Sequence, residues 1–208
     1  MRRYPLGIVY VAFGQRTPVP DAARRARELG FDHIDVPASW QGDLELPVGD
    51  RIAFPVPLAG CSCPALPPAP DSWERMVRAY RRMPTAILEP WAGSALTSTE
   101  AVLAFLDEVP GLRILVDTGH VTCWGGDPVD LLPHAAHVQL RQARRGVNQA
   151  RHGDVDFARV LEALDDTGYR GLLSVEYFDL PDRGAPLEDP LGHALALAEE
   201  LRPLLART

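Results

Sequence analysis

LRILVDTGH, at residues 112–120, is the stretch that decides the fold of this chain. Its apolar residues run directly into Asp117, which is followed by a glycine turn and His120. A short apolar run of this kind is typical of a strand buried in a parallel sheet. We therefore expect Asp117 at the carboxyl end of a strand and His120 on the loop after it. Both side chains could then face one pocket that binds a metal or a sugar.

Three other stretches share this pattern of an apolar run with polar residues at its end. The runs are 85–88, which ends in Glu89, 137–140, which ends in Arg141-Gln142, and 172–175, which ends in Glu176. The intervals from Glu89 to Asp117, from Asp117 to Gln139 and from Gln139 to Glu176 are 28, 22 and 37 residues. These intervals are the lengths of strand–helix units, so the chain is expected to repeat such units.

The whole chain can be divided into strands that alternate with helices. Strands are predicted at 6–12, 33–36, 51–58, 85–88, 112–117, 137–140 and 172–175, and helices at 21–29, 71–82, 99–108, 127–132, 157–167 and 189–205. This alternation predicts a parallel sheet covered by helices. The fold class expected is therefore α/β, a TIM-type (β/α) barrel in a single domain over residues 1–208. It is predicted to be shortened to about seven strands, because residues 58–85 hold one helix in place of a helix, a strand and a helix.

Composition excludes several classes of function. The net charge of −7 argues against a nucleic-acid partner, because affinity for phosphate backbones comes from clustered cations. All 21 basic residues are arginine, which excludes Schiff-base and pyridoxal phosphate chemistry that needs a lysine amine. The three cysteines form no disulfide framework and fit a reducing cytoplasm. The apolar N-terminal run is interrupted by Gly and Tyr, so neither a signal peptide nor a membrane span is expected.

The polar residues at the strand ends predict a metal-dependent reaction. In a barrel, Glu89, Asp117, Gln139 and Glu176 would converge at the carboxyl face, where barrel enzymes keep their sites. Carboxylates that lie so near to one another repel each other unless a cation lies among them. Oxygen ligands favour Mn²⁺ or Mg²⁺ as that cation. A substrate carbonyl bound there would acidify a neighbouring C–H group, and Glu89 or Glu176 could remove that proton and return it elsewhere. Isomerisation or epimerisation of a small sugar, sugar phosphate or keto acid, through an enediol, follows from this chemistry.

The same residues lie in motifs that resemble a known family. The stretches ILEP (87–90), ILVDTGH (114–120), HVQLRQA (137–143) and GDVDF…GYRGLLSVEYF (153–178) resemble the sugar phosphate isomerase/epimerase superfamily with its xylose-isomerase-like barrel. The resemblance covers residues 86–178 well and the N-terminal third loosely. Many members carry a histidine at the position of Gln139, whereas His137-Val138-Gln139 is similar to the HxQ motif of the hydroxypyruvate isomerase branch. Glutamine is the weaker, neutral ligand.

The resemblance also implies roles for single residues. It implies that the metal is held by Glu89, Asp117, Gln139 and Glu176, that Glu89 and Glu176 form the acid/base pair, and that His120 contacts the substrate. His137 shares a strand face with Gln139 and could bind substrate as well, or be buried without a role. The basic patch of Arg141, Arg144, Arg145 and Arg151 suits a small anionic or polyhydroxylated ligand, with Arg145 the candidate contact. Trp91 could form a wall of the pocket, and packing explains it equally well.

Two other functions remain open at this point. The Asp117-x-x-His120 pattern also occurs in metal-dependent nucleases and lyases of the same barrel, but those need several early histidines and only His33 precedes His120 here. A non-catalytic barrel that binds a metabolite or a protein is the other alternative, supported by the shortened region 58–85. The exposed strand edge of an incomplete barrel would favour a homodimer.

Overall fold

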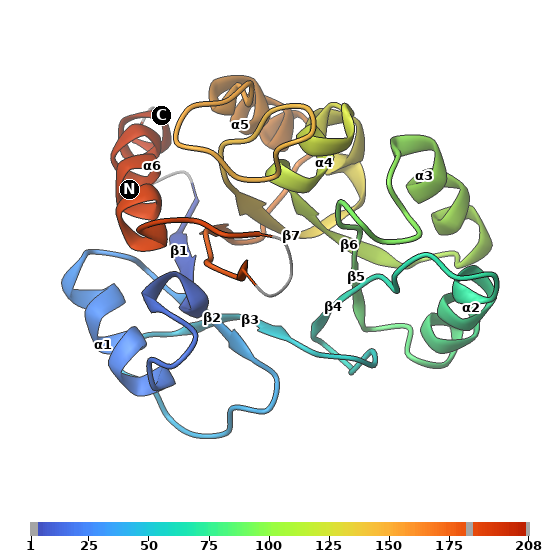
Figure 1. Cartoon of the computed structure of the whole chain (residues 1–208), viewed down its shortest axis with the longest axis horizontal. Helices are drawn as coiled ribbons and strands as arrows, with labels where there is room; N and C mark the ends of the chain where they lie inside the picture. The colour runs from blue at the N-terminus through green and yellow to red at the C-terminus, as the bar shows by residue number, and fades with distance from the viewer. Residues whose placement is uncertain (1–3, 182–184, 207–208) are drawn as a thin grey trace.

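The structure, a computed structural model, describes residues 4–181 and 185–206. LRILVDTGH forms β6 (Arg113–Asp117), which is buried beyond its first residue, and the start of the helix after it. Seven other strands complete a closed parallel barrel in sequence order (Figure 1): β1 (Leu6–Val9), β2 (Ile34–Pro37), β3 (Val48–Ile52), β4 (Ser62–Pro64), β5 (Ile87–Glu89), β7 (Ala135–Leu140) and β8 (Leu173–Val175). The prediction of a TIM-type barrel is confirmed.

The helices lie outside the strands in Figure 1 and bury their apolar faces against them. They are α1 (Val19–Glu28), α2 (Ser72–Arg82), α3 (Thr99–Glu108), α4 (Thr118–Trp124), α5 (Phe157–Asp166) and α6 (Pro190–Leu205), with the 3₁₀ helices η1 (Tyr10–Phe13) and η2 (Pro128–His134). Side chains close several N-termini: Ser98 accepts from Ala101 N at α3, and Asp156 accepts from Arg159 N at α5. Among the described residues, none of these helices is long and apolar enough to cross a membrane.

The expected number of about seven strands is wrong. The missing strand is β4, only three residues long, which pairs with β3 through Ile52 and Ser62 and with β5 through all three of its residues. The third strand is also misplaced in the prediction, because β3 ends at Ile52 and Pro55 and Pro57 lie in the loop beyond it. Proline lacks the N–H that a strand donates to its neighbour, which disfavours continuation of the strand through two prolines.

Eight strands fit into 208 residues because two connections are short. Neither the segment 38–47 before β3 nor the segment 53–61 after it contains a helix. In Figure 1 the edge of the barrel beside β3 accordingly carries loops between α1 and α2. The described strands close into a ring, so the exposed edge expected of an incomplete barrel is absent, and with it that argument for a homodimer.

Candidate functional site

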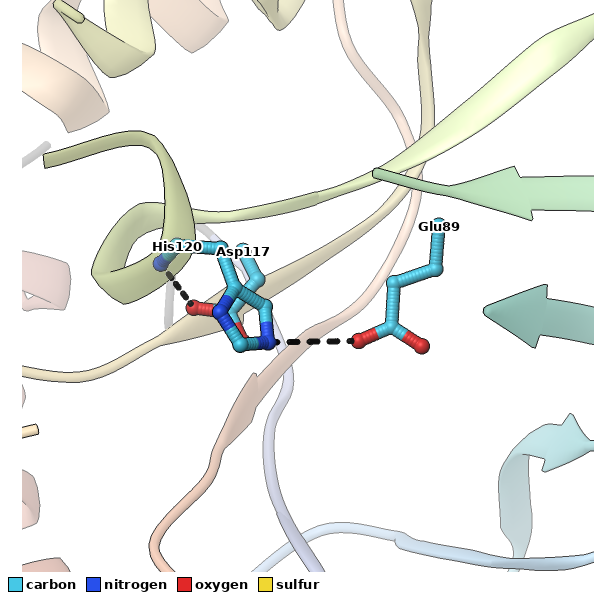
Figure 2. Close-up of side chains that lie close together, drawn as sticks. All are labelled: Glu89, Asp117 and His120. Carbon is cyan, nitrogen blue, oxygen red and sulfur yellow. Dashed lines mark hydrogen bonds and ion pairs between the residues drawn. The ribbon is translucent and has the colours of Figure 1, made fainter. Parts of the chain in front are cut away.

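Three carboxylates lie where the carboxyl ends of β5, β6 and β8 meet. Glu89 and Asp117 are the last residues of β5 and β6, and Glu176 directly follows β8. All three are buried, with at most 8% of the residue exposed. Figure 2 shows the carboxylate of Glu89 facing the ring of His120, whose Nε2 lies 3.9 Å from Glu89 Oε1. Glu89, Asp117 and His120 offer ligand atoms within 4.8 Å of one another, and this triad suggests a site for a divalent metal.

Asp117 is held in place by the helix that it begins. Its Oδ1 accepts hydrogen bonds from the backbone N–H groups of Gly119, at 2.7 Å, and His120, at 3.3 Å. These are N-cap bonds, so the residues after Asp117 form the first turn of α4 in place of the loop expected from the sequence. The cap fixes the positions of Asp117 and His120 relative to each other.

Arg141 enters the same cluster from the end of β7. Its side chain is fully buried, and it donates to Asp117 through Nε, 3.0 Å from Oδ1, and through Nη2 to Oδ2. Nη2 also lies 2.9 Å from His120 Nε2 and 3.2 Å from Glu176 Oε2. The ring of Phe178 covers the guanidinium, with 4.9 Å between Cζ and the ring centroid. The site therefore contains a cation that belongs to the chain.

The sequence placed Arg141 at the end of the run 137–140 and in a basic patch, but its contact with the carboxylates was not predicted. The available signal was the alternation of side chains along a strand, since His137, Gln139 and Arg141 are two residues apart and must share a face. All three are buried in the structure. Strand periodicity extended one residue past β7 would have found it.

The residues that follow Asp117 bind Arg141 and leave space for its side chain. Thr118 Oγ1 accepts a hydrogen bond from the Arg141 N–H, at 3.0 Å, and donates one to the Arg141 carbonyl, at 2.9 Å. Gly119 leaves the space that the arginine side chain fills, because a Cβ there would overlap with Arg141 Nε and Cγ. Each residue of the sequence Asp117-Thr118-Gly119-His120 thus contacts Arg141 or makes room for it.

His120 is surrounded by hydrogen-bond donors. The backbone N–H of Ala92 lies 3.3 Å from Nδ1, and Arg141 Nη2 lies 2.9 Å from Nε2. A neutral imidazole has one acceptor nitrogen, so only one of these contacts is a hydrogen bond in a given tautomer. Burial and then the charge of Arg141 lower the pKa of His120 to about 3, which keeps the ring neutral. A neutral ring suits a metal ligand or a contact to a substrate hydroxyl.

The two glutamates bind protons more tightly than ordinary carboxylates. Burial, followed by the charge of Asp117, raises the pKa of Glu89 to about 8. Burial also raises the pKa of Glu176 well above its ordinary value, although Arg141 opposes this change. Burial would raise the pKa of Asp117 as well, but Arg141 lowers it below its ordinary value. The cluster therefore joins one firmly ionised carboxylate to two glutamates whose pKa values are raised above the ordinary range.

Gln139 is a buried amide without a hydrogen-bond partner. It is fully buried, and neither its Oε1 nor its Nε2 has a partner among the described residues. Glu176 Oε2 likewise accepts no hydrogen bond there, although it forms the ion pair with Arg141. Unpaired buried polar atoms are costly, so these atoms are suited to a ligand. With Glu89 and Asp117 they form an oxygen-rich donor set that fits a hard divalent ion.

The remaining predicted substrate contacts are separated in the structure. Trp91 is half-buried beside the cluster, with its ring centroid 6.4 Å from that of His120 and its Nε1 donating to the Ala65 carbonyl, at 2.7 Å. Arg145 is exposed and lines a different surface pocket of about 320 Å³, together with Asp127 and Arg159. Substrate roles for Trp91 and Arg145 stay predictions.

His137 lies in a second buried polar group inside the barrel, which the sequence analysis missed. Its Nε2 is 2.8 Å from Asp35 Oδ2, and Asp35 Oδ1 accepts from the Asp50 N–H, at 3.0 Å. His33 Nε2 lies 3.0 Å from Ser174 Oγ. Asp35 counteracts the effect of burial on His137 and raises its pKa above the ordinary value. Pairing with Asp35 accounts for the burial of His137, and its contact with substrate stays a prediction.

Proteins of known structure with this fold include several sugar epimerases. An L-ribulose 3-epimerase superposes with a TM-score of 0.70 at 18% identity, covering 97% of this chain and 94% of that one. A D-psicose 3-epimerase with D-tagatose from Clostridium cellulolyticum H10 superposes with a TM-score of 0.68 at 15% identity, covering 97% of this chain and 99% of that one. A xylose isomerase-like TIM barrel protein from Mycobacterium smegmatis in complex with magnesium superposes with a TM-score of 0.64 at 13% identity, covering 95% of this chain and 98% of that one. At these identities the likeness establishes the fold alone.

Sequence comparison gives a curated relative and a family. The rhizopine catabolism protein MocC of Rhizobium meliloti is 32% identical in an alignment that covers 56% of this chain and 46% of that protein. The alignment thus spans less than half of that relative. The sequence profile of the xylose isomerase-like TIM barrel matches residues 20–201. The narrower resemblance to the hydroxypyruvate isomerase branch stays a prediction. The match over most of the chain shows that this protein belongs to the xylose isomerase-like TIM barrel family.

Proposed function

We propose that this protein is a metal-dependent isomerase or epimerase of a small sugar, sugar phosphate or keto acid. The observation that carries the proposal is the meeting of Glu89, Asp117 and Glu176 at the carboxyl end of the barrel. Barrel enzymes hold their reacting groups at this end. Sugar epimerases among the proteins of like fold agree with the proposal.

The metal proposed is Mn²⁺ or Mg²⁺, held by Glu89, Asp117, Gln139 and Glu176. The unpaired amide atoms of Gln139 support this ligand set. When bound, the ion would polarise a substrate carbonyl and so acidify the C–H group next to it.

Proton transfer is assigned to Glu89 and Glu176. Burial raises the pKa of both side chains, which suits groups that hold a proton in one step and release it in another. One carboxylate would remove the proton of the substrate C–H, and an enediol would then be reprotonated on the other carbon or on the other face. In this proposal neutral His120 contacts a hydroxyl oxygen of the substrate.

Exchange of substrate hydrogen with solvent tests the proposal. Protein supplied with Mn²⁺ or Mg²⁺ would be incubated in D₂O with a panel of ketoses, sugar phosphates and hydroxypyruvate, and ¹H NMR would follow the C–H group beside the carbonyl. We expect deuterium uptake together with a new isomer, and a loss of about 100-fold or more in Glu89→Gln and Glu176→Gln. Glu200→Gln, an exposed change on α6, is the matched control. Undiminished exchange in Glu176→Gln would contradict the assigned acid/base pair, and absence of exchange across the panel would count against the activity.

The structure removes one argument for a non-catalytic barrel. That alternative depended on a missing strand–helix unit between residues 58 and 85. β4 and α2 lie in that region, and the ring of strands is complete.

A further inference from the structure

We propose that Arg141 is a built-in cation of the carboxylate cluster, and that its guanidinium and a divalent metal ion exclude each other there. This inference rests on the proposed function for the metal itself. It adds that the chain supplies its own counter-ion when no metal is bound, and that metal binding requires Arg141 to move.

The position of Arg141 Nη2 is the first support. Atoms of three residues approach this nitrogen, namely Oδ2 of Asp117, Nε2 of His120 at 2.9 Å and Oε2 of Glu176 at 3.2 Å. Each is an atom type that binds divalent metals, and Asp117 and His120 belong to the triad whose ligand atoms lie within 4.8 Å of one another. A metal bound to these atoms would need the space that Nη2 occupies.

The surrounding residues are arranged to hold Arg141 in this position when no metal is bound. Thr118 binds both the N–H and the carbonyl of Arg141, and Gly119 leaves room for its side chain. Phe178 covers the face of the guanidinium. The side chain of Arg141 is also fully buried. A surface arginine that merely reached into the cluster would not need these contacts.

Electrostatic repulsion explains why the guanidinium and a metal ion would exclude each other. The guanidinium forms two hydrogen bonds with Asp117 and an ion pair with Glu176, so it already compensates the charge that would attract a metal. A divalent ion beside a buried guanidinium would be repelled strongly in this water-poor environment. Arginine stays protonated under all ordinary conditions, so the conflict is relieved only by movement of the side chain.

Binding of Mn²⁺ to metal-stripped protein tests the inference, with free Mn²⁺ measured by electron paramagnetic resonance. Arg141→Met keeps much of the side-chain length and removes the charge and the donors, whereas Arg141→Lys keeps the charge. We expect Arg141→Met to bind Mn²⁺ about tenfold or more tightly than the wild type, and Arg141→Lys to stay near the wild type. The midpoint of thermal unfolding is a second readout. Without metal it should fall in Arg141→Met, and Mn²⁺ should raise it by more in this variant than in the wild type.

A measurement on the wild-type protein keeps the inference testable if Arg141→Met fails to fold. The ¹⁵N–¹H signal of Arg141 Nε, identified by its loss in Arg141→Lys, would be followed while diamagnetic Mg²⁺ is added. We expect it to shift as Mg²⁺ binds, because Nε must leave Asp117. Mg²⁺ binding without a shift would overturn the inference, and so would equal or weaker Mn²⁺ affinity in Arg141→Met.

The outcomes also separate this inference from the proposed function. Equal Mn²⁺ binding by the wild type and Arg141→Met would support the metal site and contradict competition between Arg141 and the metal. Binding by Arg141→Met but not by the wild type supports the inference and removes metal dependence from the wild-type activity. Absence of binding in both proteins overturns both ideas.

Discussion

Thr118 and Arg141 exchange two hydrogen bonds through a single hydroxyl group. Thr118 Oγ1 accepts from the Arg141 N–H at 3.0 Å and donates to the Arg141 carbonyl at 2.9 Å. The contact joins the first turn of α4 to the residue after β7, and both residues are fully buried. The Thr118 hydroxyl therefore satisfies a backbone donor and a backbone acceptor that lie beyond the end of β7. An apolar residue at this position could not do so.

Replacement of Thr118 by valine should destabilise the protein. Valine has nearly the same shape but leaves the Arg141 N–H and carbonyl without these bonds in a buried environment. An unsatisfied buried group typically costs about 1–3 kcal/mol, so we expect a loss of about 2 kcal/mol or more in the free energy of unfolding. Urea denaturation monitored by circular dichroism would measure it. Thr118→Ser, which keeps the hydroxyl, should lose markedly less, and equal losses in both variants would contradict the role given to the hydroxyl.

Replacement of Gly119 by alanine should disturb the position of Arg141. A Cβ at this position would overlap with the Arg141 side chain and with the carbonyl oxygen of Asn148. Overpacking of this kind commonly costs about 1–3 kcal/mol, and we expect the upper end because backbone as well as side chain is in the way. Thermal or urea unfolding would measure the loss.

Gly111→Ala is the matched control for this change. Gly111 has a φ of +84° and no atom within 4 Å of an added Cβ, so its replacement introduces backbone strain of about 1–2 kcal/mol without overlap. A Gly119→Ala variant that is less destabilised than Gly111→Ala would show that the space beside Arg141 is not filled as described.

The elements that the sequence predicted well are those in which local pattern and burial agree. β6 and β7 are apolar runs bounded by polar residues, and both form where expected. β4 could not be found in this way, because Ser62–Pro64 is three residues long, contains a proline and follows a proline-rich loop. Its strand geometry comes from pairing with β5 at all three positions, a contact that no local pattern records.

The site was predicted only in part for a related reason. Glu89, Asp117 and Glu176 could be placed together because each ends an apolar run, and parallel strands end at the same edge of a sheet. The roles of Arg141 and Asp35 could not be predicted in this way, because their partners lie far along the chain. Asp35 binds His137 across 102 positions, and a lone aspartate in a short strand gives no sign of such a partner.

The buried pair of Asp35 and His137 should make stability depend on pH. Burial would lower the pKa of His137, but Asp35 raises it above the ordinary value. His137 in turn lowers the pKa of Asp35. The contribution of His137 is complete below its unfolded pKa of about 6.5 and is lost as pH rises through its folded pKa, whereas that of Asp35 is present above about 3.9 and is lost as pH falls.

Asp35→Asn tests this dependence, since it keeps the side-chain shape and removes the charge. We expect the loss in the free energy of unfolding to be about 3 kcal/mol or more near pH 6 and to shrink as pH approaches and passes the raised pKa of His137. Urea titrations from pH 5 to pH 9 would measure both proteins. Asp21→Asn, an exposed change on α1, should show little difference at any of these pH values. A loss for Asp35→Asn that is constant with pH would mean that His137 is neutral beside Asp35 throughout.

Gln139 is the residue whose replacement should strengthen the proposed metal site. Its amide has no hydrogen-bond partner among the described residues, so a new side chain there breaks no existing bond. Imidazole is a stronger ligand for Mn²⁺ than a neutral amide, and Gln139→His should therefore bind Mn²⁺ more tightly than the wild type, by about tenfold. Gln139→Leu, which fills similar space without a donor atom, should bind it more weakly. Isothermal titration calorimetry of the metal-stripped proteins would compare the three. Equal affinity in wild type and Gln139→Leu would remove Gln139 from the ligand set, and the unpaired amide would then have to be explained by direct contact with the substrate.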